Sequence, residues 1–408
     1  MSKVQAVDLS VHLRGQRFDN SVLVKRILII LFFIPLFSQG GQLKFVYLGD
    51  SINIEYDQGV VINASVAAND KSIMAFFKAL EHTQHKDVIV QLLEYKKNYQ
   101  LNDWLYFDFV KCFLTALLKG KNENYQIAYC WYVLNKSNLN VNLRYLGGKL
   151  DLYTYSDEKI FLPYYKVEDK KFFYLQYAET RSQPSQSVRY LKFFPNKKGD
   201  SFSFRMLELP LLKKPETITK TIAYSVLGKS DSINVVLNKS IISVMNSYPP
   251  LNNDEYFKTP LSATAANTLF PELRSRINGL TKEDAIRYLL SFVRTGFKYR
   301  EYFEVYGKDR PMIAEEVLFY AESDCEDKSN LFGLLVHELV GVHALVLMYP
   351  NHINIGVALD KAIGKPFKYK GNEYSVCEPS VLGDSKEAGI GFSRVYESND
   401  NPKVIFEY

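Results

Sequence analysis

The stretch "ESDCEDKSNLFGLLVHELV", residues 322–340, decides how this sequence is interpreted. Ser323 or Asp324 is a good helix N-cap, and apolar residues recur at helical spacing from Leu331 onward. The spacing predicts a helix that holds Cys325 in its first turn and packs its remaining length into a core. A helix N-terminus favours a thiolate, whereas the neighbouring carboxylates oppose ionisation. Cys325 is therefore either a nucleophile that needs a cationic partner or a small apolar residue at a helix start.

Two predicted strands downstream supply the partners that such a thiol needs. "HINIGVAL" alternates apolar and less apolar residues from His352, and "NEYSVCEPS" places Glu378 at the end of a second strand, before Pro379. A thiol, an imidazole and a carboxylate can act as nucleophile, base and orienting group. The sequence therefore predicts Cys325, His352 and Glu378 as a catalytic triad. The alternative is a chance succession of three unrelated residues.

Residues 281–392 resemble the core of the transglutaminase-like superfamily, a papain-like cysteine fold, in the manner of its exported bacterial members. The matching segments are "FKYREY", the helix start "DCED", "GVHALVLMY", "NHINIGVAL" and "YSVCEPS". The resemblance implies Cys325 as nucleophile and His352 as general base. It implies Glu378 as the third member, where the family usually carries Asp. No Trp flanks Cys325, so the calcium-dependent crosslinking members are not suggested.

The length of the chain indicates more than one domain. It has 408 residues, of which 47% are apolar, so two or three domains with real cores are expected. We expect an α+β protein with a signal peptide region at 1–40, where Val24 is an alternative start of translation. An N-terminal α+β domain at 41–180, a β-rich module at 181–265 and a transglutaminase-like catalytic domain at 266–408 follow.

The N-terminus has the pattern of an export signal. Lys25 and Arg26 precede the apolar run "ILIILFFIPLF", and the small residues of "SQGGQ" follow with a plausible cleavage point near Ser38 or Gly40. The run is short for a span of the bilayer. We expect a protein exported to the periplasm or cell envelope, or secreted, that meets the membrane only through this segment. The alternative is a buried strand or an uncleaved anchor.

Other classes of function and site are not favoured. The formal charge of +5 is spread along the chain, so no nucleic-acid partner is expected. "HELVGVH" is similar to a zinc motif, but His337 and His343 are six residues apart and fall on different sides of a helix. We therefore expect no metal and no cofactor. The four cysteines are too few for a disulfide scaffold.

The sequence also contains a weak internal repeat. A shift of 203 residues lays 122–155 on 325–358, with helix, strands and hydrophobic phase in agreement. We interpret residues 65–180 as a degenerate copy of the same fold. The alternative is that any helix followed by two strands would align as well.

All three triad positions differ in that copy. At this shift, or at one residue less for the last pair, the aligned residues are Asn122 with Cys325, Lys149 with His352 and Gln176 with Glu378.

Two functions follow from these patterns. The first is an exported cysteine enzyme that acts on amide bonds of a protein or cell-wall peptide. It would proceed through a thioester, by hydrolysis or by acyl transfer. The alternative is a non-catalytic envelope protein that uses the fold for binding or as a scaffold.

Overall fold

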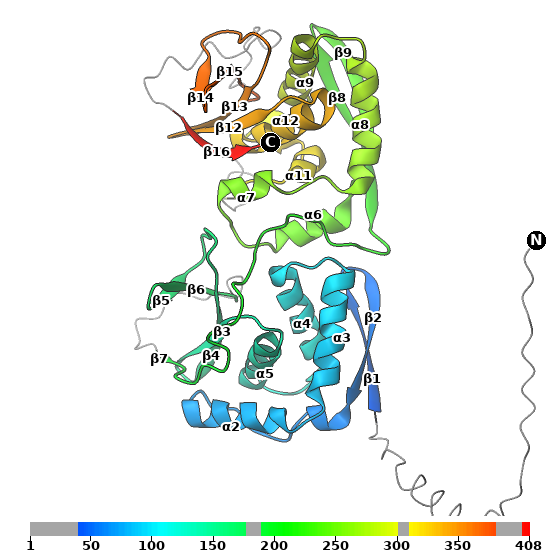
Figure 1. Cartoon of the computed structure of the whole chain (residues 1–408). Coiled ribbons are helices and arrows are strands. Elements are labelled where there is room, and N and C mark those ends of the chain that lie inside the picture. Colours follow the sequence, from blue (N-terminus) through cyan, green and yellow to red (C-terminus); the bar gives the residue numbers. More distant parts are fainter. Residues whose placement is uncertain (1–39, 177–188, 301–309, 381–401) are drawn as a thin grey trace, which may run out of the picture.

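A computed structural model of the chain describes residues 40–176, 189–300, 310–380 and 402–408. All but the last residue of the predicted signal region lies outside this described part. The described residues form two units of mixed helix and sheet, one after the other along the chain (Figure 1). The protein therefore belongs to the α+β class. Among the described residues, no helix combines the length and the apolar character that a bilayer span requires.

The N-terminal unit begins with a hairpin of β1 (Gly40–Tyr47) and β2 (Asp50–Asp57), followed by the 3₁₀ turn η1 (Gln58–Val60). Four helices follow: α2 (Asp70–Glu81), α3 (His85–Asn98), α4 (Asp103–Leu117) and α5 (Glu123–Lys136). An antiparallel sheet of order β5-β6-β4-β3-β7 completes the unit. Its strands are β3 (Val141–Leu146), β4 (Lys149–Tyr155), β5 (Tyr164–Val167), β6 (Lys170–Tyr174) and β7 (Arg189–Tyr190). Helix α5 is buried on most sides because α2, α4, β3 and β4 all pack against it.

The C-terminal unit begins with a hairpin of β8 (Thr217–Val226) and β9 (Lys229–Asn238). The helices are α6 (Lys239–Asn246), α7 (Asn253–Phe257), α8 (Ala263–Ile277), α9 (Lys282–Gly296), α11 (Ala314–Phe319) and α12 (Cys325–Leu335), which runs into the π-helical turn η3 (Val336–Val340). The short strands β10 (Lys298–Tyr299) and β11 (Glu322–Ser323) precede and follow α11 in the chain and pair with each other in parallel. An antiparallel sheet of order β14-β15-β13-β12-β16 covers α12. Its strands are β12 (Ala344–Tyr349), β13 (His352–Val357), β14 (Phe367–Tyr369), β15 (Asn372–Cys377) and β16 (Lys403–Glu407).

The two units share one topology. Taken in chain order, β3 to β7 occupy the same places in their sheet as β12 to β16 do in theirs. The hairpins also pack alike: β2 lies on α3 and β1 on α4, while β9 lies on α8 and β8 on α9. In Figure 1 each hairpin lies on the side of its unit opposite the sheet. The units differ in one insertion. In the C-terminal unit β10, α11 and β11 lie between α9 and α12, whereas in the N-terminal unit only the described residues 118–122 separate the corresponding helices α4 and α5.

The stretch predicted as a β-rich module contributes to both units. Phe202 and Phe204 lie in the hydrophobic core of the N-terminal unit, whereas Ile233 and Val235 of β9 lie in that of the C-terminal unit. The predicted strand "SIISVMNSY" is wrong, because these residues form most of α6 and the turn after it. The side chain of Asn238 caps α6, and its apolar residues face the core with a helical period. The segment "SFSFRML" contains no strand.

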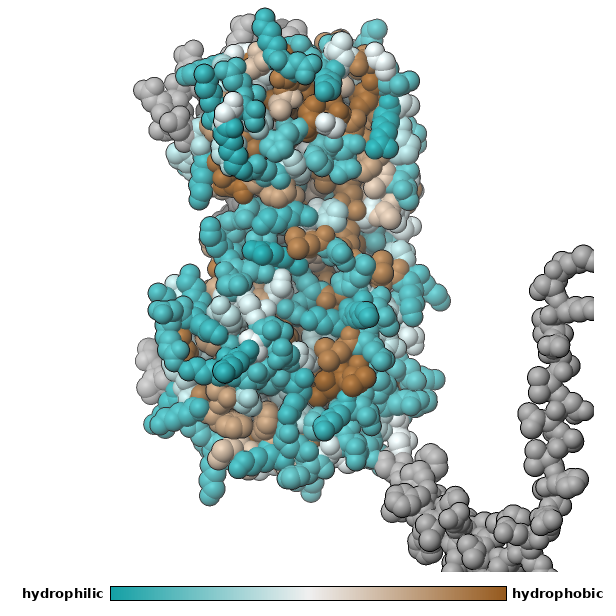
Figure 2. Space-filling model, viewed as in Figure 1, coloured by the Kyte–Doolittle hydropathy of each residue, from teal (hydrophilic) through white to brown (hydrophobic). Residues whose placement is uncertain are grey.

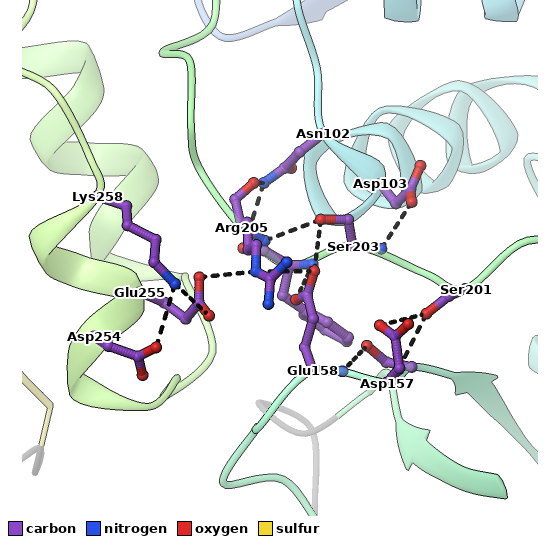
Figure 3. A network of polar contacts seen from close by, with 12 residues as sticks. Asn102, Asp103, Asp157, Glu158, Ser201, Ser203, Arg205, Asp254, Glu255 and Lys258 are labelled. Atoms are coloured by element: carbon purple, nitrogen blue, oxygen red, sulfur yellow. Dashed lines mark hydrogen bonds and ion pairs between the residues drawn. The ribbon is translucent and has the colours of Figure 1, made fainter. Parts of the chain in front are cut away.

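A network of polar contacts joins the two units (Figure 3). Arg205 Nε donates to Glu255 Oε2 of α7 at 3.0 Å and lies 3.7 Å from Glu158 Oε1 of the N-terminal unit. Glu158 also accepts from Ser203 Oγ and from the backbone N–H of Phe204, both at 2.8 Å. Both carboxylates are buried. Arg205 therefore connects a carboxylate of one unit to a carboxylate of the other.

Outside the cores, apolar side chains are dispersed over the surface. On the face shown in Figure 2 they form small separate patches among hydrophilic residues. The large buried side chains instead fall into two main clusters, one for each unit. The site described next lies in the C-terminal unit.

Candidate active site

The start of α12 is fixed by a capping box of two aspartates. Asp324 Oδ1 accepts from the backbone N–H of Glu326 at 3.0 Å and of Asp327 at 3.2 Å. Asp327 Oδ2 accepts in return from the N–H of Asp324 at 3.2 Å, and its Oδ1 accepts from Met312 N–H at 2.7 Å. These bonds satisfy amides that a helix start leaves without intrahelical partners. The predicted helix start is confirmed, with Asp324 as the N-cap and Cys325 as the first helical residue.

Strand β13 places His352 beside the start of α12. His352 is the first residue of β13, directly after the turn that joins it to β12. Ser329 Oγ of α12 donates to the carbonyl of Ile353 at 3.0 Å. The backbone N–H of Ile353 lies close enough to the Cys325 sulfur to lower the pKa of the thiol. The thiol therefore lies against the residue that follows His352.

Glu378 comes to the same place from the end of β15. The pairing of Ile355 with Cys377 sets Glu378 across from Asn354, on the same face as His352. His352 Nε2 and Glu378 Oε2 are 2.6 Å apart, and the two side chains are 12% and 13% exposed. The fold thus brings the three predicted site residues to one end of the C-terminal sheet. Their catalytic roles stay a prediction.

Both oxygens of the Glu378 carboxylate are held. Ser380 donates to Oε1 through its backbone N–H at 2.9 Å and its hydroxyl at 2.7 Å. The side-chain amide of the buried Asn354 lies against both groups, 2.7 Å from Glu378 Oε2 and 3.0 Å from His352 Nε2. Arg294 Nε donates to the backbone carbonyl of Glu378 at 2.7 Å. Ser380 and Asn354 therefore hold the carboxylate beside His352, and Arg294 of α9 holds the backbone of Glu378.

The charges around the site act on the two reactive groups in known directions. Burial and the charge of Asp324 raise the pKa of the Cys325 thiol; the Ile353 N–H opposes this, and Glu378 adds to it. Burial by itself would lower the pKa of His352, but the hydrogen bond and charge of Glu378 outweigh it, and the pKa is raised. The resting thiol is therefore protonated, while an imidazolium at His352 is stabilised.

A buried lysine follows Cys325 by one helical turn. Lys328 Nζ donates to the backbone carbonyls of Phe297 at 2.6 Å and of Arg294 at 3.4 Å. Burial and the charge of Arg294 lower the pKa of Lys328 to about 8, although Glu378 acts in the opposite direction. Lys328 thus ties the start of α12 to the end of α9, from which Arg294 reaches Glu378.

Sequence patterns did not identify these supporting residues. Ser380 follows Glu378 by two residues, a spacing that permits a local side-chain contact, so it could have been suggested. Arg294, Lys328 and Asn354 come from a helix face or a strand face, and only the tertiary structure shows what they contact.

The described part of the chain contains no cluster of three His, Cys, Asp or Glu side chains that could hold a metal ion. His343 Nδ1 instead lies 3.1 Å from the hydroxyl of Tyr374. Each of the four cysteines is a free thiol.

Comparison with known proteins finds no matching family model, no matching curated protein and no matching solved structure.

Proposed function

We propose that this protein is an exported cysteine enzyme of the transglutaminase-like, papain-like class that attacks amide carbonyls through Cys325. The observation that carries the proposal is the 2.6 Å contact between His352 Nε2 and Glu378 Oε2, whose carboxylate also acts on the pKa of Cys325. A base that is itself oriented by a carboxylate is the arrangement that nucleophilic catalysis by a thiol needs. The supporting features are the helix that starts at Cys325 and the antiparallel sheet that covers it.

The proton can move along this arrangement in both directions. Because Nε2 faces Glu378, the other nitrogen of His352, Nδ1, accepts the thiol proton as the Cys325 sulfur attacks the carbonyl carbon. The carbon–nitrogen bond then breaks, His352 returns the proton to the leaving amine, and a thioester remains on Cys325. Water or another amine next attacks the thioester and releases the acyl group. Glu378 stabilises the imidazolium in each half of the cycle.

The raised pKa of the thiol fits this sequence of events. A neutral thiol waits in the resting site and loses its proton only during attack, so a permanent thiolate is not required. The developing negative charge on the carbonyl oxygen is favoured near the N-terminus of α12, where the backbone N–H of Cys325 is a donor.

The proposed substrates are proteins or cell-wall peptides outside the cytoplasm. Hydrolysis of a peptide or isopeptide bond is preferred over crosslinking, because the sequence lacks the Trp of the crosslinking members beside Cys325.

Acetylation by p-nitrophenyl acetate tests the proposal, because this ester reports an acyl-enzyme without knowledge of the natural substrate. The full chain should gain one acetyl group on Cys325, detected by peptide mass spectrometry. Cys112 is a matched internal control, a half-buried thiol whose pKa is raised to about 11 by burial and by the charge of Asp108. Acetylation of Cys325 no faster than that of Cys112 would refute the proposal.

A second function, a non-catalytic envelope binding protein or scaffold, is favoured by one observation. The carboxylates of Asp324, Glu326 and Glu378 all raise the pKa of Cys325, which opposes the ionisation that a nucleophile needs. In that case Cys325 and Cys112 would react alike, and His352→Ala would leave the acetylation rate of Cys325 unchanged.

A further inference from the structure

The N-terminal unit carries the framework of the candidate active site with different side chains. Helix α5 starts at Glu123 after its N-cap, as α12 starts at Cys325, so Glu123 corresponds to Cys325. This moves the alignment predicted from the sequence by one residue. Strand β4 starts at Lys149 as β13 starts at His352, so Lys149 corresponds to His352. Lys149 Nζ lies 3.4 Å from Glu123 Oε2. An ion pair therefore replaces the thiol and imidazole.

The strand register identifies the third corresponding residue. Tyr174 of β6 pairs with Tyr153 of β4, as Val376 of β15 pairs with Gly356 of β13. Two residues further along each strand lie Gln176 and Glu378, as predicted from the sequence. Gln176 Oε1 accepts from the backbone N–H of Leu152 at 2.9 Å. The side-chain oxygen of Gln176 is thus hydrogen-bonded to the backbone of β4, and its NH₂ group is the part of the amide that can donate to a ligand.

A cavity of about 200 Å³ lies at this place in the N-terminal unit. Its lining is mixed: Phe107, Leu114, Ile127, Cys130 and Leu152 are apolar, and Lys111, Thr115, Glu123, Gln126 and Gln176 are polar or charged. Thr115 is the third residue from the end of α4, as Arg294 is of α9. Arg294 donates to the backbone of Glu378, and at the corresponding position of the N-terminal unit the shorter side chain of Thr115 lines the cavity.

We propose that this cavity binds one uncharged side chain of a peptide, without chemistry, as a second anchoring point for a polypeptide. A cavity of about 150 Å³ can hold a benzene ring, so the present one has the volume for a side chain of leucine or phenylalanine size. The opposite charges of Lys111 and Glu123 leave its lining without net charge, which suits an uncharged side chain. The amide of Gln176 offers a donor to a carbonyl of the same peptide. The choice of a peptide rests on the proposed function, because the corresponding place in the C-terminal unit is where the acyl donor would lie. The cavity itself does not depend on that function.

The chain contains a built-in reporter for this site. Its only two tryptophans, Trp104 of α4 and Trp131 of α5, both belong to the N-terminal unit, and Trp131 follows Cys130, which lines the cavity. Tryptophan fluorescence of the full chain can therefore be titrated with N-acetyl-leucinamide and N-acetyl-phenylalaninamide. We expect a saturable change with both probes, at least tenfold weaker binding of the amide of N-acetyl-aspartate, and a rise in the melting temperature with the apolar probes.

Two variants locate the binding. Thr115 is exposed, so Thr115→Tyr should fold normally, close the cavity and weaken binding at least tenfold. Ser275→Tyr is the matched control on an exposed position of α8 and should bind like the wild type.

A wild-type titration without a saturable change, or equal affinity in Thr115→Tyr, would overturn the inference. Acetylation of Cys325 is measured separately. A chain that binds the probes but is not acetylated contradicts only the proposed function, and the reverse result contradicts only this inference.

Discussion

Replacing Glu378 by Gln removes a charge from the candidate site and leaves its shape almost unchanged. His352 Nε2 and Glu378 Oε2 are 2.6 Å apart and mostly buried, so the contact is a charge-assisted hydrogen bond. A hydrogen bond to a charged group contributes about 1.5–3 kcal/mol, against about 1 kcal/mol for a neutral pair. The variant should therefore lose about 0.5–2 kcal/mol of unfolding free energy while His352 is protonated.

The loss should depend on pH with a defined sign. Glu378 raises the pKa of His352 in the folded protein. The stabilisation is then fully present below the unfolded histidine pKa of about 6.5 and disappears as the pH rises through the higher folded value. Urea unfolding should show a larger difference between wild type and Glu378→Gln at about pH 5.5 than at about pH 9.

Glu373→Gln is the matched control for this experiment. Glu373 lies on the same strand but forms an exposed ion pair with Lys368 at 3.3 Å, so its replacement should change stability little at either pH. Equal losses for Glu378→Gln at the two pH values, or no loss at all, would refute the proposed coupling of Glu378 to His352.

Three further substitutions test the fold around the site. Gly333→Ala should destabilise by about 1–3 kcal/mol, because its Cβ would lie 2.3 Å from the ring of Tyr408; an unchanged thermal midpoint would contradict that contact. Glu316→Gln should cost about 3–5 kcal/mol of unfolding free energy in denaturant, because it removes the carboxylate charge that lies 2.6 Å from the guanidinium of the buried Arg310. A cost below about 1 kcal/mol, as for a surface ion pair, would show that this buried pair is not needed for stability. Thr281→Ala should cost about 0.5–2 kcal/mol by removing the N-cap of α9, and no loss on thermal melting would show that the cap is dispensable.

The local parts of the candidate site were predictable from the sequence. Asp324 is a capping residue before a run of helical spacing, and the alternation in β13 and β15 sets the faces of His352 and Glu378. Capping and alternation depend only on residues that are neighbours in the sequence. They therefore predict the helix and strands that carry the three residues, but not the distances between the three side chains.

The supporting contacts and the arrangement of the hairpins depend on residues far apart in the chain. Nothing near Lys328 in the sequence indicates that its ammonium is buried against the carbonyl of Phe297. Alternation in β8 and β9 predicts half-buried strands, but it does not show that α8 and α9 cover them. In α6, isoleucines and valine favour a strand, whereas the cap from Asn238 and the core beneath the helix decide otherwise.

Whether acetylation of Cys325 depends on His352 distinguishes a catalytic thiol from an inert one. The measurement is the single-turnover rate of acetylation of Cys325 by p-nitrophenyl acetate against pH, in the wild type and in His352→Gln. General-base catalysis typically contributes about 10²–10⁴-fold, so we expect His352→Gln to lose at least about a hundredfold in rate near neutral pH. The variant should regain rate only at alkaline pH, where the thiol ionises by itself. Equal rates in the two proteins across the whole pH range would show that His352 is not the base for Cys325.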